Sequence, residues 1–255
     1  MTKTQSCFAV FTCLAAVSVA RAGTISASWF SMASNDPDTQ KNYSPGTMYN
    51  TSIGGGLGPD GLPVLNAAGA AFFVDHNASG ELTWWSTQDP TVSVLNNPVY
   101  PPTISLPFSD SNMYTNTTIL GANGDDSQAF LTASFAGAFN LPSASSVTFN
   151  VCSDDDELVY LSGGIFGAGT MVVDNGGIHA TSCTSGNVNT SLLSNVAAGN
   201  YTISIFYADR ERVGATFSLT SALNIVPVTG VPEPGTILLF CSGLSLLWTR
   251  REKRF

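Results

Sequence analysis

Basic side chains are scarce in the long central part of this 255-residue chain. Between residues 23 and 232, three bases (Lys41, Arg210 and Arg212) stand against sixteen acids, which gives a net charge of −13. Such a negative surface repels a phosphate backbone, so we expect no nucleic-acid partner. A hydrophobic content of 44% with only 11% charged residues excludes a disordered chain.

Helical periodicity is also missing. No stretch of ten or more residues before residue 236 repeats its apolar positions at helical spacing, and we find no internal repeat. Short alternating runs separated by Gly, Asn and Pro turns are typical of strands, and we expect about ten to twelve of them. The pattern predicts an all-β fold, a β-sandwich or jelly roll. The predicted strands lie at residues 23–30, 70–74, 81–86, 129–139, 147–151, 158–161, 171–174, 201–207 and 215–223.

Two details of this pattern make specific predictions. The runs at 70–74 and 81–86 are expected to form a hairpin about a turn at 77–80. Trp84 and Trp85 are neighbours on the second run. Because successive strand residues face opposite ways, one tryptophan is expected in the core and the other at the surface.

Cysteine is rare in the central part as well. Cys7 and Cys13 lie in the N-terminal apolar segment and Cys241 in the C-terminal one, which leaves Cys152 and Cys183. Two cysteines in an exported domain most simply form one disulfide. We therefore predict a Cys152–Cys183 bridge.

The N-terminus has the features of a secretory signal peptide. Residues 1–22 contain Lys3, an apolar run at 7–20 and the sequence Ala20-Arg21-Ala22. A positive start, an apolar middle and an A-x-A site define such a peptide. We expect cleavage before Gly23 and export of the body, residues 23–226.

The C-terminus has three parts in a fixed order. Residues 227–235 are a linker that contains Pro232, Glu233 and Pro234. Residues 236–249 are an apolar segment that we expect to form a short membrane-spanning helix, and residues 250–255 are a basic tail that stays in the cytoplasm. The alternative for the apolar segment is a buried C-terminal strand.

This order resembles the PEP-CTERM sorting signal. The resemblance implies export through the inner membrane, processing near the motif by a membrane protease called exosortase, and association with exopolysaccharide. Pro232, Glu233 and Pro234 would then be a recognition sequence for that protease and not an active site. The helix would hold the chain in the membrane until it is processed.

Four consecutive acids interrupt the strand pattern at Asp154, Asp155, Asp156 and Glu157. With so few bases to pair them, water or a cation has to solvate the cluster. Calcium takes six to eight hard oxygens, which carboxylates, carbonyls and waters supply. Asp154 and Asp155 can share one ion only if the backbone departs from a regular strand there. The alternative is a solvated acidic turn without a metal. A second pair, Asp125 and Asp126, is read as an ordinary turn.

Residues 147–220 resemble a fibro-slime domain, which is akin to the protective-antigen and flocculin family of sugar-binding β-sandwiches. Three motifs carry the resemblance in order: SDDD followed by VYLSG at residues 153–163, VVD with GGIH at 172–179, and IFYADR at 205–210. The resemblance implies a calcium ion at Asp154 and Asp155, within the cluster that includes Asp156, and sugar hydroxyls bound through that calcium. His179 is expected to be a structural hydrogen-bonding residue of the second motif.

These observations predict an exported, noncatalytic protein of the cell envelope, cell surface or extracellular matrix. We expect it to bind exopolysaccharide or another cell-surface glycan, with calcium as the cofactor. A purely structural surface or matrix protein without a specific ligand is the first alternative. A polysaccharide-acting enzyme is the second, although the sequence has no H-E-x-x-H, C-x-x-C or G-x-S-x-G motif and we name no catalytic residue.

Overall fold

The computed structural model describes residues 23–39, 53–96, 99–115, 129–185, 196–212, 214–221 and 223–228. The predicted signal peptide, the Asp125–Asp126 pair, the sorting motif and the predicted helix at 236–249 lie outside these residues. Within the described part of the chain, no helix has both the length and the apolar character needed to cross a membrane.

Strands make up about half of the described chain and helices very little of it, and the all-β prediction is confirmed. The elements besides strands are a six-residue helix α1 (Ala67–Phe72) and a 3-10 turn η1 (Gly164–Phe166). The strands are β1 (Thr24–Ala33), β2 (Ile53–Leu57), β3 (Pro63–Leu65), β4 (Val92–Val94), β5 (Thr103–Ser105), β6 (Phe108–Asp110), β7 (Ala129–Leu141), β8 (Phe149–Ser153), β9 (Asp156–Ser162), β10 (Thr170–Asn175), β11 (Ser182–Ser185), β12 (Gly199–Ala208), β13 (Phe217–Ser221) and β14 (Val226–Pro227).

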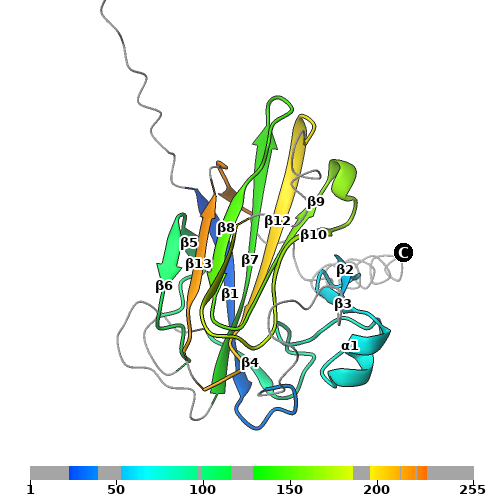
Figure 1. Cartoon of the computed structure of the whole chain (residues 1–255), viewed down its shortest axis with the longest axis vertical. Coiled ribbons are helices and arrows are strands. Elements are labelled where there is room, and N and C mark those ends of the chain that lie inside the picture. The colour runs from blue at the N-terminus through cyan, green and yellow to red at the C-terminus, as the bar shows by residue number, and fades with distance from the viewer. Residues whose placement is uncertain are drawn as a thin grey trace, which may run out of the picture.

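The strands form two sheets that pack face to face (Figure 1). The larger sheet has the order β3-β2-β10-β9-β12-β7-β1-β4, with β14 paired to β7 and β5 paired to β1. The smaller sheet has the order β11-β8-β13-β6. Every pair of named strands is antiparallel. The predicted β-sandwich is therefore present, with its long axis along β7 and β12.

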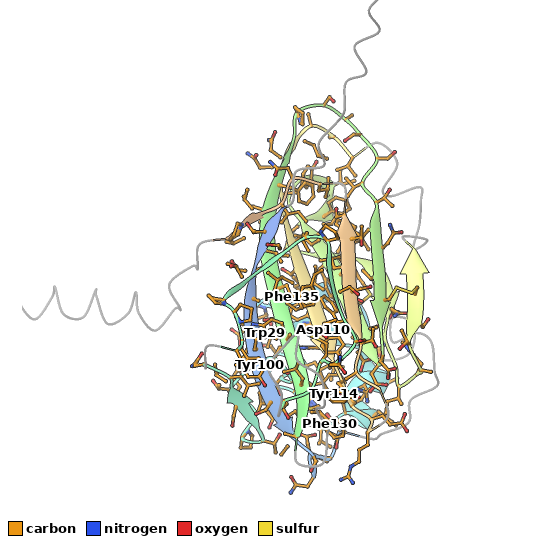
Figure 2. All side chains as sticks on the ribbon, turned by 90° about the vertical axis from the view of Figure 1, so that its left-hand side faces the viewer. Trp29, Tyr100, Asp110, Tyr114, Phe130 and Phe135 are labelled. Carbon is orange, nitrogen blue, oxygen red and sulfur yellow. A yellow bond between two sulfur atoms is a disulfide. The ribbon has the colours of Figure 1, made fainter. Side chains whose placement is uncertain are left out.

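The main core fills the space between the two sheets. Alternate residues of each strand point into it, as the period of two requires. Phe135 of β7 contacts Trp29 of β1 edge to face at 5.4 Å and stacks on Phe217 of β13 at 4.9 Å. Figure 2 shows Trp29 and Phe135 close together among the side chains between the layers. Burial of these large rings is the main stabilising contribution of the sandwich.

A second core covers the outer face of the larger sheet. Leu158, Tyr160 and Phe206 point to that face and belong to one buried cluster with Phe73 and Trp84 from the segment 53–92. This segment carries α1 and the strands β2 and β3, which form the edge of the larger sheet next to β10 (Figure 1). We call it the outer layer. The larger sheet is consequently covered on both faces.

The outer layer corrects two predictions. No hairpin joins 70–74 to 81–86, because residues 67–72 form α1, whose N-cap Asn66 accepts hydrogen bonds from the N–H groups of Ala68 and Gly69. The turn at 77–80 is present, closed by the Gly80 N–H to Asn77 carbonyl bond. Trp84 and Trp85 are both buried, at 0% and 3% exposure, since they lie in an irregular segment pressed onto the sheet rather than in a strand.

The predicted disulfide is confirmed. Cys152 of β8 and Cys183 of β11 are partners in the smaller sheet and form a bond across a sequence separation of 31. The bridge ties β8, which leads into the acidic cluster, to the segment that follows His179. Such a bond is typical of exported and cell-surface proteins.

Candidate functional site

The four acids 154–157, which we call the acidic turn, lie where the chain passes from one sheet to the other. Strand β8 ends at Ser153 in the smaller sheet, and β9 begins at Asp156 in the larger one. Asp155 has a φ of +65°, in the left-handed region that Asp and Asn tolerate better than other non-glycine residues. The departure from a regular strand that the sequence argument required is therefore present.

The acidic turn is buried, so its description as a solvated turn is wrong. Asp155, Asp156 and Glu157 are 0% exposed, and Asp154 is 5% exposed. Buried carboxylates are costly unless they are hydrogen-bonded or paired. The carboxylates of Asp154, Asp155 and Asp156 are instead held by groups from other parts of the chain.

Asp155 joins the three motifs of the fibro-slime resemblance. Its Oδ1 accepts the N–H of His179 at 3.1 Å, and its Oδ2 accepts the N–H groups of Arg210 at 2.6 Å and Glu211 at 2.8 Å. The Asp155 N–H donates in turn to the His179 carbonyl at 3.2 Å. One carboxylate thus links the acidic turn to the GGIH motif and to the end of the IFYADR motif.

Asp156 holds the buried Arg210 side chain. The two form an ion pair of 2.5 Å between Asp156 Oδ2 and Arg210 Nε, with both side chains fully buried. Asp156 Oδ1 accepts the Gly177 N–H at 2.5 Å. The guanidinium also lies 4.7 Å from the centre of the Trp84 ring, a cation–π distance, and donates to the Asp38 carbonyl at 3.3 Å. Arg210 therefore connects the acidic turn to the outer layer.

Burial shifts two acids of the turn towards their neutral form. The pKa of Asp155 is raised to about 6 by burial and by the neighbouring Asp156 charge, against the lowering effect of Arg210 and the His179 N–H. Burial raises the pKa of Glu157 well above 4.5. Both carboxylate oxygens of Glu157 are without a hydrogen-bond partner among the described residues. Burial without a partner therefore favours the protonated form of Glu157.

His179 is a structural residue, as expected. Its ring nitrogens lie 3.1 Å from the Asn175 carbonyl and 3.0 Å from the Ala180 carbonyl. The side chain is only partly buried. These contacts hold the GGIH loop against the end of β10.

The oxygens of the acidic turn are largely occupied by the protein itself. Five of the six carboxylate oxygens of Asp154, Asp155 and Asp156 accept hydrogen bonds, Asp154 Oδ2 from the Thr181 hydroxyl at 3.0 Å. N–H donors and a guanidinium aimed at these oxygens compete with a cation for the same positions. The arrangement does not offer calcium an open set of ligands, and calcium at this turn stays a prediction.

A second acidic group, which sequence reasoning missed, lies in the neighbouring loops. One carboxylate oxygen from each of Asp36, Asp75 and Asp89 lies within 4.8 Å of the other two. Asp38 lies between this trio and the acidic turn, because its carbonyl accepts Arg210 and its carboxylate accepts the N–H groups of Val74 and Asp75. No local motif marks these residues. The only sequence signal is a set of acids without bases to pair them.

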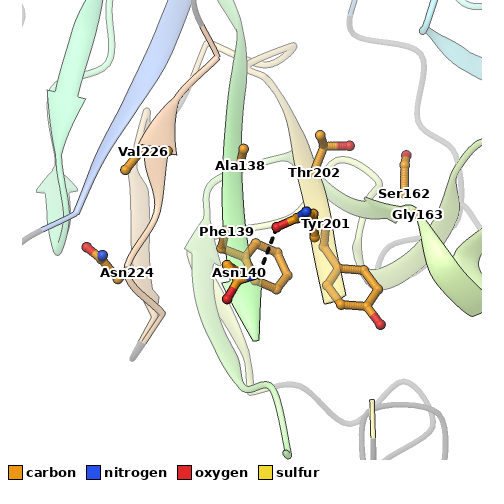
Figure 3. Close-up of a pocket in the computed structure, with 10 residues that line it drawn as sticks. Ala138, Phe139, Asn140, Ser162, Gly163, Tyr201, Thr202, Asn224 and Val226 are labelled. Atoms are coloured by element: carbon orange, nitrogen blue, oxygen red, sulfur yellow. Dashed lines mark hydrogen bonds between the residues drawn. The ribbon is translucent and has the colours of Figure 1, made fainter. Parts of the chain in front are cut away.

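A groove with a mostly apolar lining and a few polar side chains, which we call the β7–β12 groove, opens where β7 ends and β12 begins (Figure 3). It has a volume of about 420 Å³. Asn140 and Asn200 are both exposed, and the Asn140 amide donates to Asn200 Oδ1 at 2.7 Å. The buried rings of Phe139 and Tyr201 stack beneath them at 5.5 Å. The other polar side chains that line the groove are Ser162, Thr202 and Asn224.

Comparison with solved structures finds only remote likenesses. A PA14 sugar-binding domain from an RTX adhesin is 17% identical with a TM-score of 0.28, over 43% of this chain and 55% of that chain. The A domain of epithelial adhesin 9 from Candida glabrata, in complex with Galb1-4GlcNAc, is 12% identical with a TM-score of 0.30, over 77% and 81%. A beta-glucosidase from Kluyveromyces marxianus in complex with glucose is 10% identical with a TM-score of 0.28, over 71% and 20%.

The chain spans about half the length of the adhesin PA14 domain that it matches. At these identities and TM-scores, no conclusion about function follows. No protein-family model matches the sequence, and neither does any curated protein.

Proposed function

We propose that this chain is an exported, noncatalytic protein of the cell surface or extracellular matrix that binds polysaccharide. One observation carries the proposal. His179 and Arg210, from the second and third motifs that resemble a fibro-slime domain, lie 24 and 55 residues from Asp155 of the first motif, yet the N–H groups of both donate to the Asp155 carboxylate. The contact between the three motifs in one buried unit supports the resemblance more strongly than the order of the motifs in the sequence.

The β7–β12 groove is the place where we expect the glycan, with its apolar lining against the faces of the sugar rings and its asparagine amides on the sugar hydroxyls. Sugars present hydroxyl groups, and the amides of Asn140, Asn200 and Asn224 can both donate to them and accept from them. A volume of about 420 Å³ is within the range of small-ligand sites and suits one or two sugar rings. The proposal makes no use of calcium at Asp154, Asp155 or Asp156, because those oxygens serve the fold.

The proposal also includes export and processing of the chain. The Cys152–Cys183 disulfide agrees with export. We propose that residues 1–22 direct the body across the inner membrane. An exosortase-type protease then processes the chain near Pro232, Glu233 and Pro234.

One observation favours a second candidate, a purely structural matrix protein. The resemblance implies a ligand site at the acidic turn. The carboxylate oxygens there already accept hydrogen bonds and an ion pair from within the protein. A protein whose motif residues only hold the fold together does not need a ligand.

Retention of the purified protein on a panel of immobilised bacterial exopolysaccharides distinguishes the candidates. We expect retention on at least one polymer, unchanged by a calcium chelator and without release of reducing sugar. Absence of retention on every polymer would favour the structural protein, and release of sugar would favour an enzyme.

A further inference from the structure

The trio Asp36, Asp75 and Asp89 comes from three loops that the fold brings to one place. Asp36 follows β1, Asp75 follows α1 and Asp89 precedes β4. One carboxylate oxygen of each lies within 4.8 Å of the others. Calcium–oxygen distances are about 2.3 to 2.6 Å, so oxygens that share one ion lie no more than about 5 Å apart. The three oxygens therefore fit around a single calcium ion.

Two carboxylate oxygens of the trio have no hydrogen-bond partner among the described residues. Asp89 is 4% exposed, and its Oδ2 is buried with no hydrogen-bond partner among the residues that the structure describes. Asp75 Oδ2 is also buried without a hydrogen-bond partner among those residues. A buried carboxylate oxygen normally has a hydrogen-bond partner. The lack of one at these two oxygens points to a ligand that the protein binds there.

The described residues offer the trio little positive charge. Arg210 and Arg212 are the basic residues in the described ranges. Arg210 is paired with Asp156, and Arg212 is exposed. A bound divalent cation would balance the negative charge of the three carboxylates.

The surroundings hold the three carboxylates in position. Asp38 accepts the Asp75 N–H at 3.0 Å and donates its own N–H to Asp36 Oδ1 at 2.7 Å. The Thr91 hydroxyl contacts both Asp36 Oδ2 and Asp89 Oδ1. These bonds orient the side chains of Asp36 and Asp89 and hold the backbone of Asp75, and they leave Asp89 Oδ2 for a ligand.

We propose that Asp36, Asp75 and Asp89 bind one calcium ion that fastens the outer layer to the end of β1. Carboxylates from three separate loops suit calcium, which accepts irregular oxygen coordination, better than magnesium, which demands a small octahedral site. Backbone carbonyls and waters complete the coordination. The site is separate from the acidic turn and does not depend on glycan binding.

Calorimetric titration and thermal melting of the full-length protein, purified in mild detergent and stripped with a chelator, test this proposal. We expect one calcium per chain with a Kd of about 1 mM or tighter, in the range of extracellular calcium modules. We also expect a rise in Tm of several degrees at 10 mM calcium and a smaller rise at 10 mM magnesium.

The variants Asp89→Asn and Asp75→Asn should each weaken calcium binding at least tenfold. Their calcium-free Tm should equal or exceed that of the wild type, because each removes a buried charge, and this separates loss of a ligand from loss of the fold. Asp60→Asn, a change at an exposed acid of the outer layer, should leave binding within twofold.

Terbium, which takes calcium sites, provides a second readout. Trp84 donates through Nε1 to Asp38 Oδ2 at 3.3 Å and lies next to the trio, so its excitation should sensitise terbium emission in the wild type and not in Asp89→Asn. Absence of calcium binding in the wild type would overturn the proposal. So would binding that survives in Asp89→Asn and Asp75→Asn but is lost in Asp154→Asn, because the ion would then lie at the acidic turn.

Discussion

Replacing Asp155 tests whether one carboxylate holds the three motifs together. Asp155→Ala leaves the N–H groups of His179 and Arg210 without their acceptor and removes the shorter of the two bonds that the Glu211 N–H donates. Hydrogen bonds to a charged group contribute about 1.5 to 3 kcal/mol each. The φ of +65° adds about 1 kcal/mol of strain for alanine. The burial cost that raises the pKa of Asp155 to about 6 offsets part of this loss. We expect a net loss of about 3 to 5 kcal/mol.

Asp155→Asn is the matched control, because asparagine tolerates the same φ and keeps one acceptor oxygen. We expect it to lose about 1 to 3 kcal/mol. Urea unfolding of the disulfide-bonded protein at pH 7, followed by tryptophan fluorescence, measures both free energies. If Asp155→Ala unfolds within 1 kcal/mol of the wild type, the carboxylate does not hold the motifs together and our account of the turn is refuted.

Three further predictions concern the same region. The double variant Cys152→Ser/Cys183→Ser should lose about 3 to 4 kcal/mol of unfolding free energy by the chain-entropy estimate for its loop, and reduction of the wild type should reproduce its urea midpoint. Arg210→Met should lose about 3 to 5 kcal/mol by leaving Asp156 buried without its cation; adding Asp156→Asn should recover part of that loss, and a double variant no better than the single one would contradict the pairing. Folding raises the pKa of Glu157 above 4.5, so the folded state keeps the Glu157 proton at pH values where the unfolded chain loses it. The unfolding free energy is therefore highest below about pH 4.5. It falls by about 1.4 kcal/mol per pH unit as the pH rises towards the folded pKa. Glu157→Gln should therefore show a flatter loss of stability with pH in urea titrations from pH 5 to 8, and an unchanged slope would mean that Glu157 is ionised in the fold.

The strands were predictable because the fold buries one side of each. The alternation in residues 129–139 and 201–207 appears in β7 and β12, whose inward side chains meet the smaller sheet. The prediction failed at 70–74, where an alanine-rich run serves a helix as well as a strand. The Asn66 cap decides between them. It failed for Trp84 and Trp85 because alternation applies only to a strand, and this segment is irregular.

The acidic turn was found from its sequence, but its environment was not. Its burial depends on Arg210, which lies 54 residues away, and on N–H groups that any residue type provides. The trio Asp36, Asp75 and Asp89 has no local signature, because only the tertiary fold brings the three loops together. The β7–β12 groove has no local sequence signature either, since its asparagines lie on three separate segments.

Polysaccharide binding through the groove is the central claim, and an affinity measurement on matched variants tests it most directly. The polymer retained by the wild type is titrated against the wild type, Asn140→Ala/Asn200→Ala and Asn150→Ala. Asn150 is an exposed asparagine of β8 in the smaller sheet, outside the groove. We predict that the groove variant binds at least tenfold more weakly with an unchanged Tm, while Asn150→Ala binds as the wild type does. Equal affinity of all three proteins would contradict the claim.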